Sequence, residues 1–486
     1  MGKEKLLASF FWKLMERVGV QVISIIVQIV LARLVAPKQF GILAIIVVFY
    51  NIFDIFVQKG FGSAIIRMKE LTQEDIDTAF IVSGLIAIVL FFVIIVTAPY
   101  VGLFYGDNSI VSPLMVLSVS LLISPFYCIY NSLLVRDMNF KVIFIRGIVS
   151  ALLSGLLGVW LALRGLEIWA MVAQIIANQV LLTIVMAVGL NYHLGFSFSS
   201  LSFKAIFSFG KNVLFTELLL YIVESVRTFS IGKMYSSAQL AYYDRGQTYP
   251  NVMMNAINDT FFSILLPYFS KVQDDTYKLK EIYLKYTRLL IFIVVPIFMG
   301  LAAVSREFIE ALLTKRWQPA VPYLIIFCLY QTIFPYQTIS KVLLYAKGES
   351  KMVWNIEIWK SILSLILMVI SLNIGALYVA LSLLFVRLFC ICLYLRRLNT
   401  IAGECNAIRY SFKPFISALI MFCMIFFMPT FDGGVWLMLL MKMLIGGCIY
   451  ILMESIIDCS FVKSCLSVIY NKIKNEKSFD NRGMFF

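Results

Sequence analysis

Charged residues are scarce in this sequence, and their scarcity excludes an ordinary soluble fold. Asp, Glu, Lys and Arg make up 14% of the 486 residues, whereas hydrophobic residues make up 61%. Soluble domains carry about 25% charged residues. Apolar runs of about 20 residues, each able to cross a bilayer as a helix, recur along the whole chain. Runs of about 10 residues that alternate apolar and polar, as in a transmembrane barrel, are absent. The composition predicts an all-α integral membrane protein.

The sequence also contains little that could support catalysis. Its single histidine, His193, lies in a predicted loop, where a structural or neutral role is expected. There is no Walker A phosphate loop, no glycine-rich dinucleotide fingerprint and no histidine-based nucleophile system. No predicted loop is long enough for a folded soluble domain, and the largest outer one, about 305–320, has room for one short interfacial helix. We therefore expect no enzyme activity, no cofactor and no ATP-driven step.

Cysteines are absent from every predicted outer loop. All nine fall in predicted spans or on the predicted cytoplasmic side, so no disulfide framework is implied. Cys390 and Cys392 lie in an apolar run without a partnering His or second Cys pair, which argues against a metal site. A cleavable signal peptide is not indicated either, because Glu16 and Arg17 interrupt the first apolar run. We expect that run to remain as the first span.

About fourteen apolar runs are present, and an even number places both termini on one side of the membrane. Loops on the N-terminal side carry about 25 Lys and Arg residues, against about 7 on the other side, so both termini are predicted to be cytoplasmic. The net charge of +14 then reflects topology and attraction to anionic lipids, and requires no nucleic-acid partner. The predicted spans are 10–32, 40–60, 78–104, 111–135, 142–163, 166–189, 205–232, 239–266, 285–304, 321–345, 353–373, 375–395, 411–429 and 433–457.

A weak internal repeat relates the two halves of the chain. When the sequence is shifted by 200, Asn51 falls on Asn251, Ser63 on Ser263 and Asp75 on Asp275, without a gap across two spans. Coincidence between apolar segments is the alternative explanation. A real repeat predicts two parallel six-helix lobes with substrate bound between them. We therefore predict an N-lobe over 1–200, a C-lobe over 201–400, two further helices over 401–460 and a cytoplasmic tail over 461–486.

Four predicted spans, at corresponding places in the two halves, carry polar residues along one helix face. A charge facing lipid at mid-bilayer costs about 3 kcal/mol or more, so these faces must meet water or other helices. Two interpretations stay open: a wet cavity between the lobes, or interhelical hydrogen bonds that hold the bundle together. Snorkelling to the membrane surface is a further explanation for Arg17 and Arg245. The faces consist of Arg17, Gln21, Ser24 and Gln28; Asn51, Asp54 and Gln58; Glu217, Tyr221, Glu224, Arg227 and Thr228; and Asp244, Thr248, Asn251, Asn255 and Asn258.

The side chains in these faces favour an anionic, hydroxyl-rich solute. Guanidinium groups bind phosphate oxygens through paired hydrogen bonds, and amides suit sugar hydroxyls. Arg387 and Lys442 add cations near the middle of two later spans. A cationic substrate is not excluded, because Asp54, Glu217 and Glu224 are available as acids.

The N-terminal pattern resembles a known family. Its features are the aromatic-rich start FFWKLMERVGVQ, LARLVAPKQFG at the first outer loop, GFGSAIIR at the end of the second span, and SFGK at 208–211. Together they resemble bacterial polysaccharide and O-antigen exporters of the Wzx type, in the MATE-like MOP superfamily. The resemblance implies a flippase of the inner membrane that moves undecaprenyl-pyrophosphate-linked oligosaccharide repeat units outward by alternating access of two six-helix lobes.

The resemblance also implies roles for particular residues and partners. Cations would contact pyrophosphate and acidic sugars, and amides would line the cavity. A polysaccharide polymerase and a chain-length regulator are partners to consider, and a proton gradient, a sodium gradient or membrane potential could drive transport. Two alternatives remain, a MATE-type drug or cation antiporter and a flippase for the peptidoglycan lipid precursor. The expected cavity residues are Arg17, Gln21, Asn51, Asp54, Glu224, Arg227, Arg245, Asn251, Asn255 and Arg387.

Overall fold

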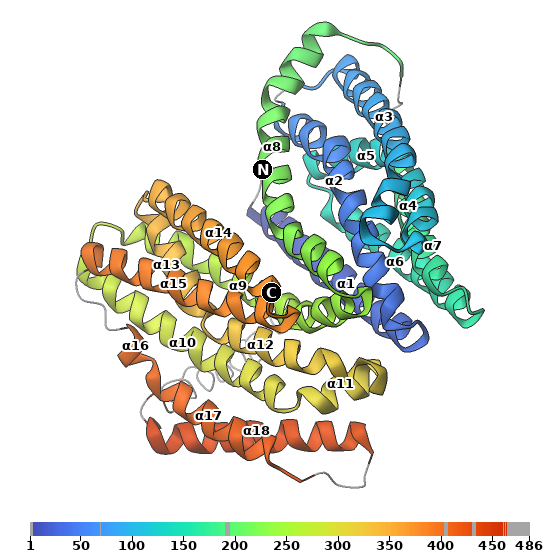
Figure 1. The fold of residues 1–486 in the computed structure, drawn as a ribbon. Coiled ribbons are helices and arrows are strands. Elements are labelled where there is room, and N and C mark those ends of the chain that lie inside the picture. Colours follow the sequence, from blue (N-terminus) through green and yellow to red (C-terminus); the bar gives the residue numbers. More distant parts are fainter. Residues whose placement is uncertain are drawn as a thin grey trace, which may run out of the picture. The chain divides into compact units, whose positions relative to one another are not determined.

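The computed structural model of the chain is built from helices (Figure 1). It describes residues 3–68, 70–189, 195–402, 407–429, 434–459, 461 and 463, and within these ranges no strand occurs. Ten helical segments are long and apolar enough to cross a membrane, and a pair of helices bent by 45° supplies an eleventh. Each helix satisfies its own backbone hydrogen bonds, as the hydrocarbon core requires. The chain is therefore a multi-pass α-helical membrane protein, as the composition predicts.

The chain divides into two compact units, Met1–Asp244 and Arg245–Phe486. In the N-terminal unit, α1 packs on α6, α6 on α7, and α2 on both α5 and α8. Its elements are α1 (Lys3–Leu34), α2 (Pro37–Arg67), α3 (Gln73–Tyr105), η1 (Asn108–Ile110), α4 (Val111–Ser118), η2 (Val119–Leu122), α5 (Ser124–Arg136), α6 (Phe140–Leu163), α7 (Glu167–Ala187), α8 (Ser200–Met234) and the start of α9 (Ser237–Lys271).

In the C-terminal unit, α10 is the central helix, because it packs on α12, α13 and α17 and its buried face runs from Leu279 to Ala303. The helices α14 and α15 pack against each other, as do α17 and α18. The elements after α9 are α10 (Thr276–Ala303), α11 (Ser305–Leu313), η3 (Lys315–Ala320), α12 (Val321–Thr332), α13 (Phe334–Ala346), α14 (Ser350–Leu372), α15 (Ala376–Ala402), α16 (Ala407–Tyr410), α17 (Phe412–Phe426) and α18 (Val435–Ile457).

Local sequence signals account for several helix ends. Pro37 begins α2, where its missing N–H and fixed φ are favourable. Thr72 and Asp75 form a reciprocal capping box at the start of α3. The same helix ends at Gly106, whose φ of 70° is accessible to glycine at little cost. These signals fix the short connections that align successive spans.

One span in each unit is broken at the same relative place. In the N-terminal unit the break lies at Ile123, two residues before Pro125; in the C-terminal unit it lies at Ile333, two residues before Pro335. Proline removes a helical hydrogen bond and favours such an interruption. The two breaks are 210 residues apart, and so are Met138 and Gly348, both of which have positive φ in the turn that follows. The internal architecture of the units thus supports the repeat, with a shift of 210 in this part of the chain.

The predicted spans each coincide with helical structure, but three of them fall short of the criteria for a membrane span. The apolar part of α1 covers Gly19–Leu34, α17 is also short, and α9 is too polar. The count of about fourteen transmembrane helices therefore stays a prediction.

The contact-based division falls at Asp244 because α8 packs along α2 and α3. This division depends on which helices pack together and is independent of the repeat, so the lobes at 1–200 and 201–400 stay a prediction. The residues at 305–320 do form short helices, but Ile309, Leu313 and Trp317 are buried in the C-terminal unit. One face of these helices thus packs into the core of the unit, and their position at the membrane interface stays a prediction.

Candidate functional site

The polar face of α2 is joined to two neighbouring helices by hydrogen bonds. The Asn51 amide donates to the Tyr221 hydroxyl on α8 at 3.0 Å. The Asp54 carboxylate accepts from the Ser124 hydroxyl on α5 and from the Gln58 amide, both at 2.6 Å. We call these five residues the α2 cluster. All of these donors are neutral, so the carboxylate is held by hydrogen bonds without an ion pair among the described contacts.

Close approach of two helices makes the contact between Asn51 and Tyr221 possible. The helices α2 and α8 run antiparallel, with Gly60 beside Gly210 near one end and Ile45 beside Gly232 near the other. A Cβ on Gly210 would lie 2.8 Å from the Gly60 carbonyl oxygen, so these backbones touch. Small residues at such a crossing are typical of membrane helix packing.

The α2 cluster also reaches the broken span. Ser124 is the first residue of α5, directly after the break. Its hydroxyl is fully buried and is hydrogen-bonded to Asp54 at 2.6 Å. A polar residue in the second span therefore fixes the point at which the fourth predicted span is interrupted.

A corresponding cluster lies in the C-terminal unit. The Gln331 amide, close to the break between α12 and α13, donates to the Asn251 side chain at 2.6 Å. The Thr338 hydroxyl on α13 donates to the Asn258 side chain at 2.7 Å. The guanidinium of Arg387 on α15 donates to the Gln331 side-chain oxygen and to the Tyr330 carbonyl, each at 3.1 Å. We call Asn251, Asn258, Gln331, Thr338 and Arg387 the α9 cluster.

Arg387 differs from the other buried cations in its surroundings. Its residue is 7% exposed, and its guanidinium carbon lies 3.3 Å from the centre of the Tyr330 ring and 4.3 Å from that of Phe334. Within the described part of the chain, no carboxylate forms an ion pair with it. Carbonyl oxygens and aromatic faces stabilise a cation without cancelling its charge. The site is therefore suited to an anionic group.

Lys442, Lys341 and Lys360 in the C-terminal unit are each paired with a carboxylate. Lys442 is 4% exposed, and its amine lies 2.7 Å from Glu307. Lys341 and Lys360 both pair with Glu357, and Lys341 does so at 3.0 Å. Tyr394 donates a further hydrogen bond to that carboxylate. These side chains therefore compensate one another's charge within the C-terminal unit.

The structure joins four of the ten predicted cavity residues to one or other cluster. Asn51 and Asp54 belong to the α2 cluster, and Asn251 and Arg387 to the α9 cluster. Of the other six, Arg17 has a side chain that lies outside the described residues. His193, which was not among the ten, also lies outside them. Gln21, Glu224 and Asn255 are exposed, Arg227 is half-buried and Arg245 is buried.

Sequence reasoning missed Ser124 and Gln331. Ser124 directly precedes Pro125, and Gln331 lies one turn before Pro335, so a polar residue near a proline within an apolar run was the signal that could have found them. Groups of three or more His, Cys, Asp or Glu that could hold a metal ion do not occur among the described residues.

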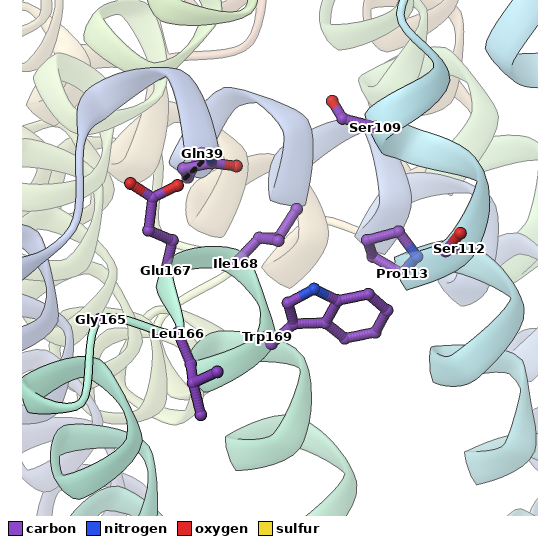
Figure 2. A pocket seen from close by; sticks show the side chains of 9 residues that line it. All are labelled: Gln39, Ser109, Ser112, Pro113, Gly165, Leu166, Glu167, Ile168 and Trp169. Atoms are coloured by element: carbon purple, nitrogen blue, oxygen red, sulfur yellow. Dashed lines mark hydrogen bonds between the residues drawn. The ribbon is translucent and has the colours of Figure 1, made fainter.

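A separate pocket of about 380 Å³ lies at one end of the N-terminal unit (Figure 2). Three segments line it: the start of α2, the η1–α4 region and the start of α7. The amide of Gln39 donates to the Glu167 carboxylate at 2.5 Å on one side, and Trp169 and Ile168 lie between this pair and Pro113. The lining residues are Gln39, Ser109, Ser112, Pro113, Gly165, Leu166, Glu167, Ile168 and Trp169.

Comparison with known proteins gives related sequences of bacterial polysaccharide synthesis. The chain is 24% identical to the teichuronic acid biosynthesis protein TuaB of Bacillus subtilis over 61% of its own length and 62% of that protein's length. It is 22% identical to the lipopolysaccharide biosynthesis protein WzxC of Escherichia coli over 79% of each chain. The match to TuaB thus spans less than two thirds of that relative.

The fold is shared with a solved flippase. The chain matches the lipid II flippase MurJ in its inward closed conformation with a TM-score of 0.70 and 16% identity, over 95% of this chain and 100% of that one. The family described as "Polysaccharide biosynthesis protein" matches residues 30–322, more than half of the chain. The resemblance to polysaccharide exporters is thereby confirmed, and the chain belongs to the polysaccharide biosynthesis protein family.

Proposed function

We propose that this protein carries undecaprenyl-pyrophosphate-linked oligosaccharide repeat units across the bacterial inner membrane by alternating access, with both termini in the cytoplasm. The observation that carries the proposal is the family membership over residues 30–322. The relatives named for teichuronic acid and lipopolysaccharide synthesis, and the fold shared with a lipid flippase, support the same activity. The exported glycan would serve O-antigen, capsule or exopolysaccharide synthesis.

Arg387 is the strongest candidate for a phosphate contact. A buried guanidinium that is surrounded by carbonyl oxygens and aromatic rings keeps its charge available, and guanidinium binds phosphate oxygens through two parallel hydrogen bonds. Amides in the two clusters would meet sugar hydroxyls. The proposed substrate contacts are Arg17, Gln21, Asn51, Asp54, Glu224, Arg227, Arg245, Asn251, Asn255 and Arg387.

The remaining parts of the proposal follow from this activity. Transport of a preformed substrate needs no catalytic group and no cofactor from this chain. A polymerase and a chain-length regulator would act on the exported units and are candidate partners. Asp54 or Glu224 would be the acid that couples transport to a proton or sodium gradient.

The proposal is tested in a strain that lacks the gene and is complemented with variants of the full chain. We expect Arg227→Ala and Arg387→Gln, at normal membrane levels, to abolish surface polysaccharide while lipid-linked precursor accumulates inside. Arg164→Ala is the matched control, since Arg164 is an exposed cation at the end of α6 and stacks on Trp160. Normal surface glycan in either test variant would remove that arginine from the substrate path.

The same strains separate the two alternatives. A cation antiporter would raise resistance to cationic dyes in step with expression and leave glycan export unchanged. A flippase for the peptidoglycan precursor would be essential in cells without any surface polysaccharide. Either result would overturn the proposed function.

A further inference from the structure

The pocket in Figure 2 is lined by residues that belong to neither the α2 cluster nor the α9 cluster. Its three lining segments follow the first, third and fifth predicted spans, so they lie on one side of the membrane. Under the proposed topology this is the outer side. At about 380 Å³ the pocket is near the lower end of the roughly 300–1,000 Å³ of small-molecule sites. A ligand the size of a mono- or disaccharide fits this volume.

The polar wall of the pocket is formed by the side chains of Gln39 and Glu167. Gln39 donates its amide to Glu167, but its side-chain oxygen is buried and has no hydrogen-bond partner in the described structure. A buried acceptor without a donor loses the hydrogen bond that it would make in water. A ligand hydroxyl in the pocket could donate to the neighbouring Glu167 carboxylate. The hydroxyls of Ser109 and Ser112 lie across the pocket.

The other wall of the pocket is aromatic. Trp169 is 40% exposed, and its ring lies between Ile168 and Pro113 (Figure 2). The face of an aromatic ring carries negative charge density and attracts polarised C–H groups. A pyranose ring presents a C–H face on one side and hydroxyls around its edge. An indole opposite an amide, a carboxylate and two hydroxyls matches both features.

The charge of the pocket narrows the ligand class. Glu167 is the only ionisable side chain among the nine lining residues. The nearby Lys38 amine lies 3.5 Å from the Asp107 carboxylate, which neutralises it. A pyrophosphate or an acidic sugar would meet an uncompensated carboxylate here, whereas a neutral or amino sugar would not. The pocket is therefore different in kind from the arginine-containing α9 cluster.

The backbone conformation at Glu167 is unusual, which indicates that the surrounding structure fixes the position of this residue. Its φ is 37°, a left-handed conformation that non-glycine residues rarely adopt. Such a conformation is unfavourable and is retained when the surrounding structure enforces it. The strained residue is the one that carries the only charge in the pocket.

We propose that this pocket is a second, extracytoplasmic glycan site, which binds a neutral or amino sugar between Trp169 and the Gln39–Glu167 pair. The assignment of the ligand to the exported glycan rests on the proposed function, because it takes the sugar from the transported repeat unit. The pocket would hold a sugar of the emerging chain after the pyrophosphate has left its cation site.

The test measures binding directly, without transport. Purified full-length protein in nanodiscs is titrated with methyl glycosides of N-acetylglucosamine, galactose, galactosamine and glucuronic acid, and with inorganic pyrophosphate. Saturation-transfer NMR gives the bound sugar face and the dissociation constants. We expect neutral and amino sugars to bind, Trp169→Ala to weaken them at least tenfold, and pyrophosphate not to compete.

Two variants make the result specific. Trp160→Ala is the matched control, because Trp160, near the end of α6, is 52% exposed against 40% for Trp169 and does not line the pocket. Ser112→Phe fills the pocket from an exposed position and replaces Trp169→Ala if the latter does not fold. Undiminished binding in both pocket variants, no binding to the wild type, or preference for glucuronide or pyrophosphate would each overturn the proposal.

A parallel assay separates this proposal from the proposed function. Flipping of lipid-linked oligosaccharide in proteoliposomes is measured with the same variants. Normal flipping by the wild type, together with no sugar binding or with binding that neither pocket variant reduces, rejects the pocket alone. Specific pocket binding in a protein that flips no lipid-linked glycan rejects the proposed transport and leaves the pocket in place.

Discussion

The buried ion pair between Lys442 on α18 and Glu307 on α11 provides a quantitative test of how the C-terminal unit is held together. The two charges are 2.7 Å apart, and their side chains are 4% and 11% exposed. At an effective dielectric of about 20, their gross attraction is about 6 kcal/mol. Desolvation costs several kcal/mol for each ion, so the net contribution of the intact pair is small. Removal of one partner leaves the other buried and unpaired.

We therefore expect Lys442→Met or Glu307→Leu alone to reduce the free energy of unfolding by about 3–5 kcal/mol. For a unit of this size that corresponds to a fall in melting temperature of roughly 6–20 °C. The double variant should lose less than either single variant, because two apolar side chains then meet. Lys315→Met is the control. The Lys315 amine lies 3.6 Å from the carboxylate of Glu310, which is on α11 like Glu307, but the Lys315 side chain is 85% exposed. We therefore expect this variant to lose about 1 kcal/mol or less.

The assay is thermal unfolding of the purified chain in detergent, followed by fluorescence-detected gel filtration. Double-mutant-cycle analysis gives the coupling between the two sites. If the two single losses simply add in the double variant, or if each is below about 1 kcal/mol, the pair does not hold α18 against α11. The calculation from burial and distance would then be refuted.

Four further predictions rest on single contacts. Gly210→Ala should cost about 1–3 kcal/mol in thermal unfolding, because its Cβ would meet a backbone carbonyl of α2 at 2.8 Å, whereas Gly84→Ala, with no atom within 4 Å, should cost nothing. Asp77→Ala should expose the segment 195–199 to protease in limited digestion, because the buried carboxylate accepts two backbone N–H groups and a hydroxyl from that segment. Met138→Gly should raise the stability by about 0.5–1 kcal/mol in the same unfolding assay, since its φ is 54°. Burial opposes ionisation of the Asp107 carboxyl, but the hydrogen bonds from Ser109 and the nearby Lys38 outweigh it and lower its pKa. The stability that the ionised carboxyl contributes is therefore present at neutral pH. It is lost as pH falls below about 3.9, the unfolded pKa, and through the lower folded pKa. Melting curves of Asp107→Asn from pH 6 to pH 3 should accordingly fall less steeply than those of the wild type.

Sequence patterns predicted the helical elements well, because each span is a long apolar run whose ends carry local signals. Pro37 and the Thr72–Asp75 capping box mark helix starts that need no knowledge of the rest of the chain. The resemblance carried by the N-terminal motifs likewise identified the family. The interrupted spans were not predicted, although Ser124 and Pro125 follow Ile123, and Pro335 follows Ile333, because the surrounding runs are apolar and long enough for one continuous helix.

The contacts of the polar faces could be predicted only in part. Helical spacing placed Asn51, Asp54 and Gln58 on one face, but it could not show which helices that face meets. The partners Ser124 and Gln331 lie 70 and 80 residues away from the side chains they bind, and hydrogen bonds at that separation depend on the tertiary packing. The cavity expected between two lobes stays a prediction.

The contacts of the polar faces and of Arg387 bear differently on the two interpretations, a wet cavity and bundle stability. Asn51, Asp54 and Asn251 have partners within their own unit, and two of them bind next to a broken helix. Interhelical hydrogen bonding therefore accounts for these contacts, and the substrate role of the three residues stays a proposal. Arg387 is different, because each of its partners is neutral and none cancels its charge. If Arg387 served only to form hydrogen bonds at the break, a neutral donor would do so with a smaller desolvation free energy than a guanidinium. The retained charge is thus the feature that bundle stability leaves unexplained and on which the proposed contact with an anionic substrate rests.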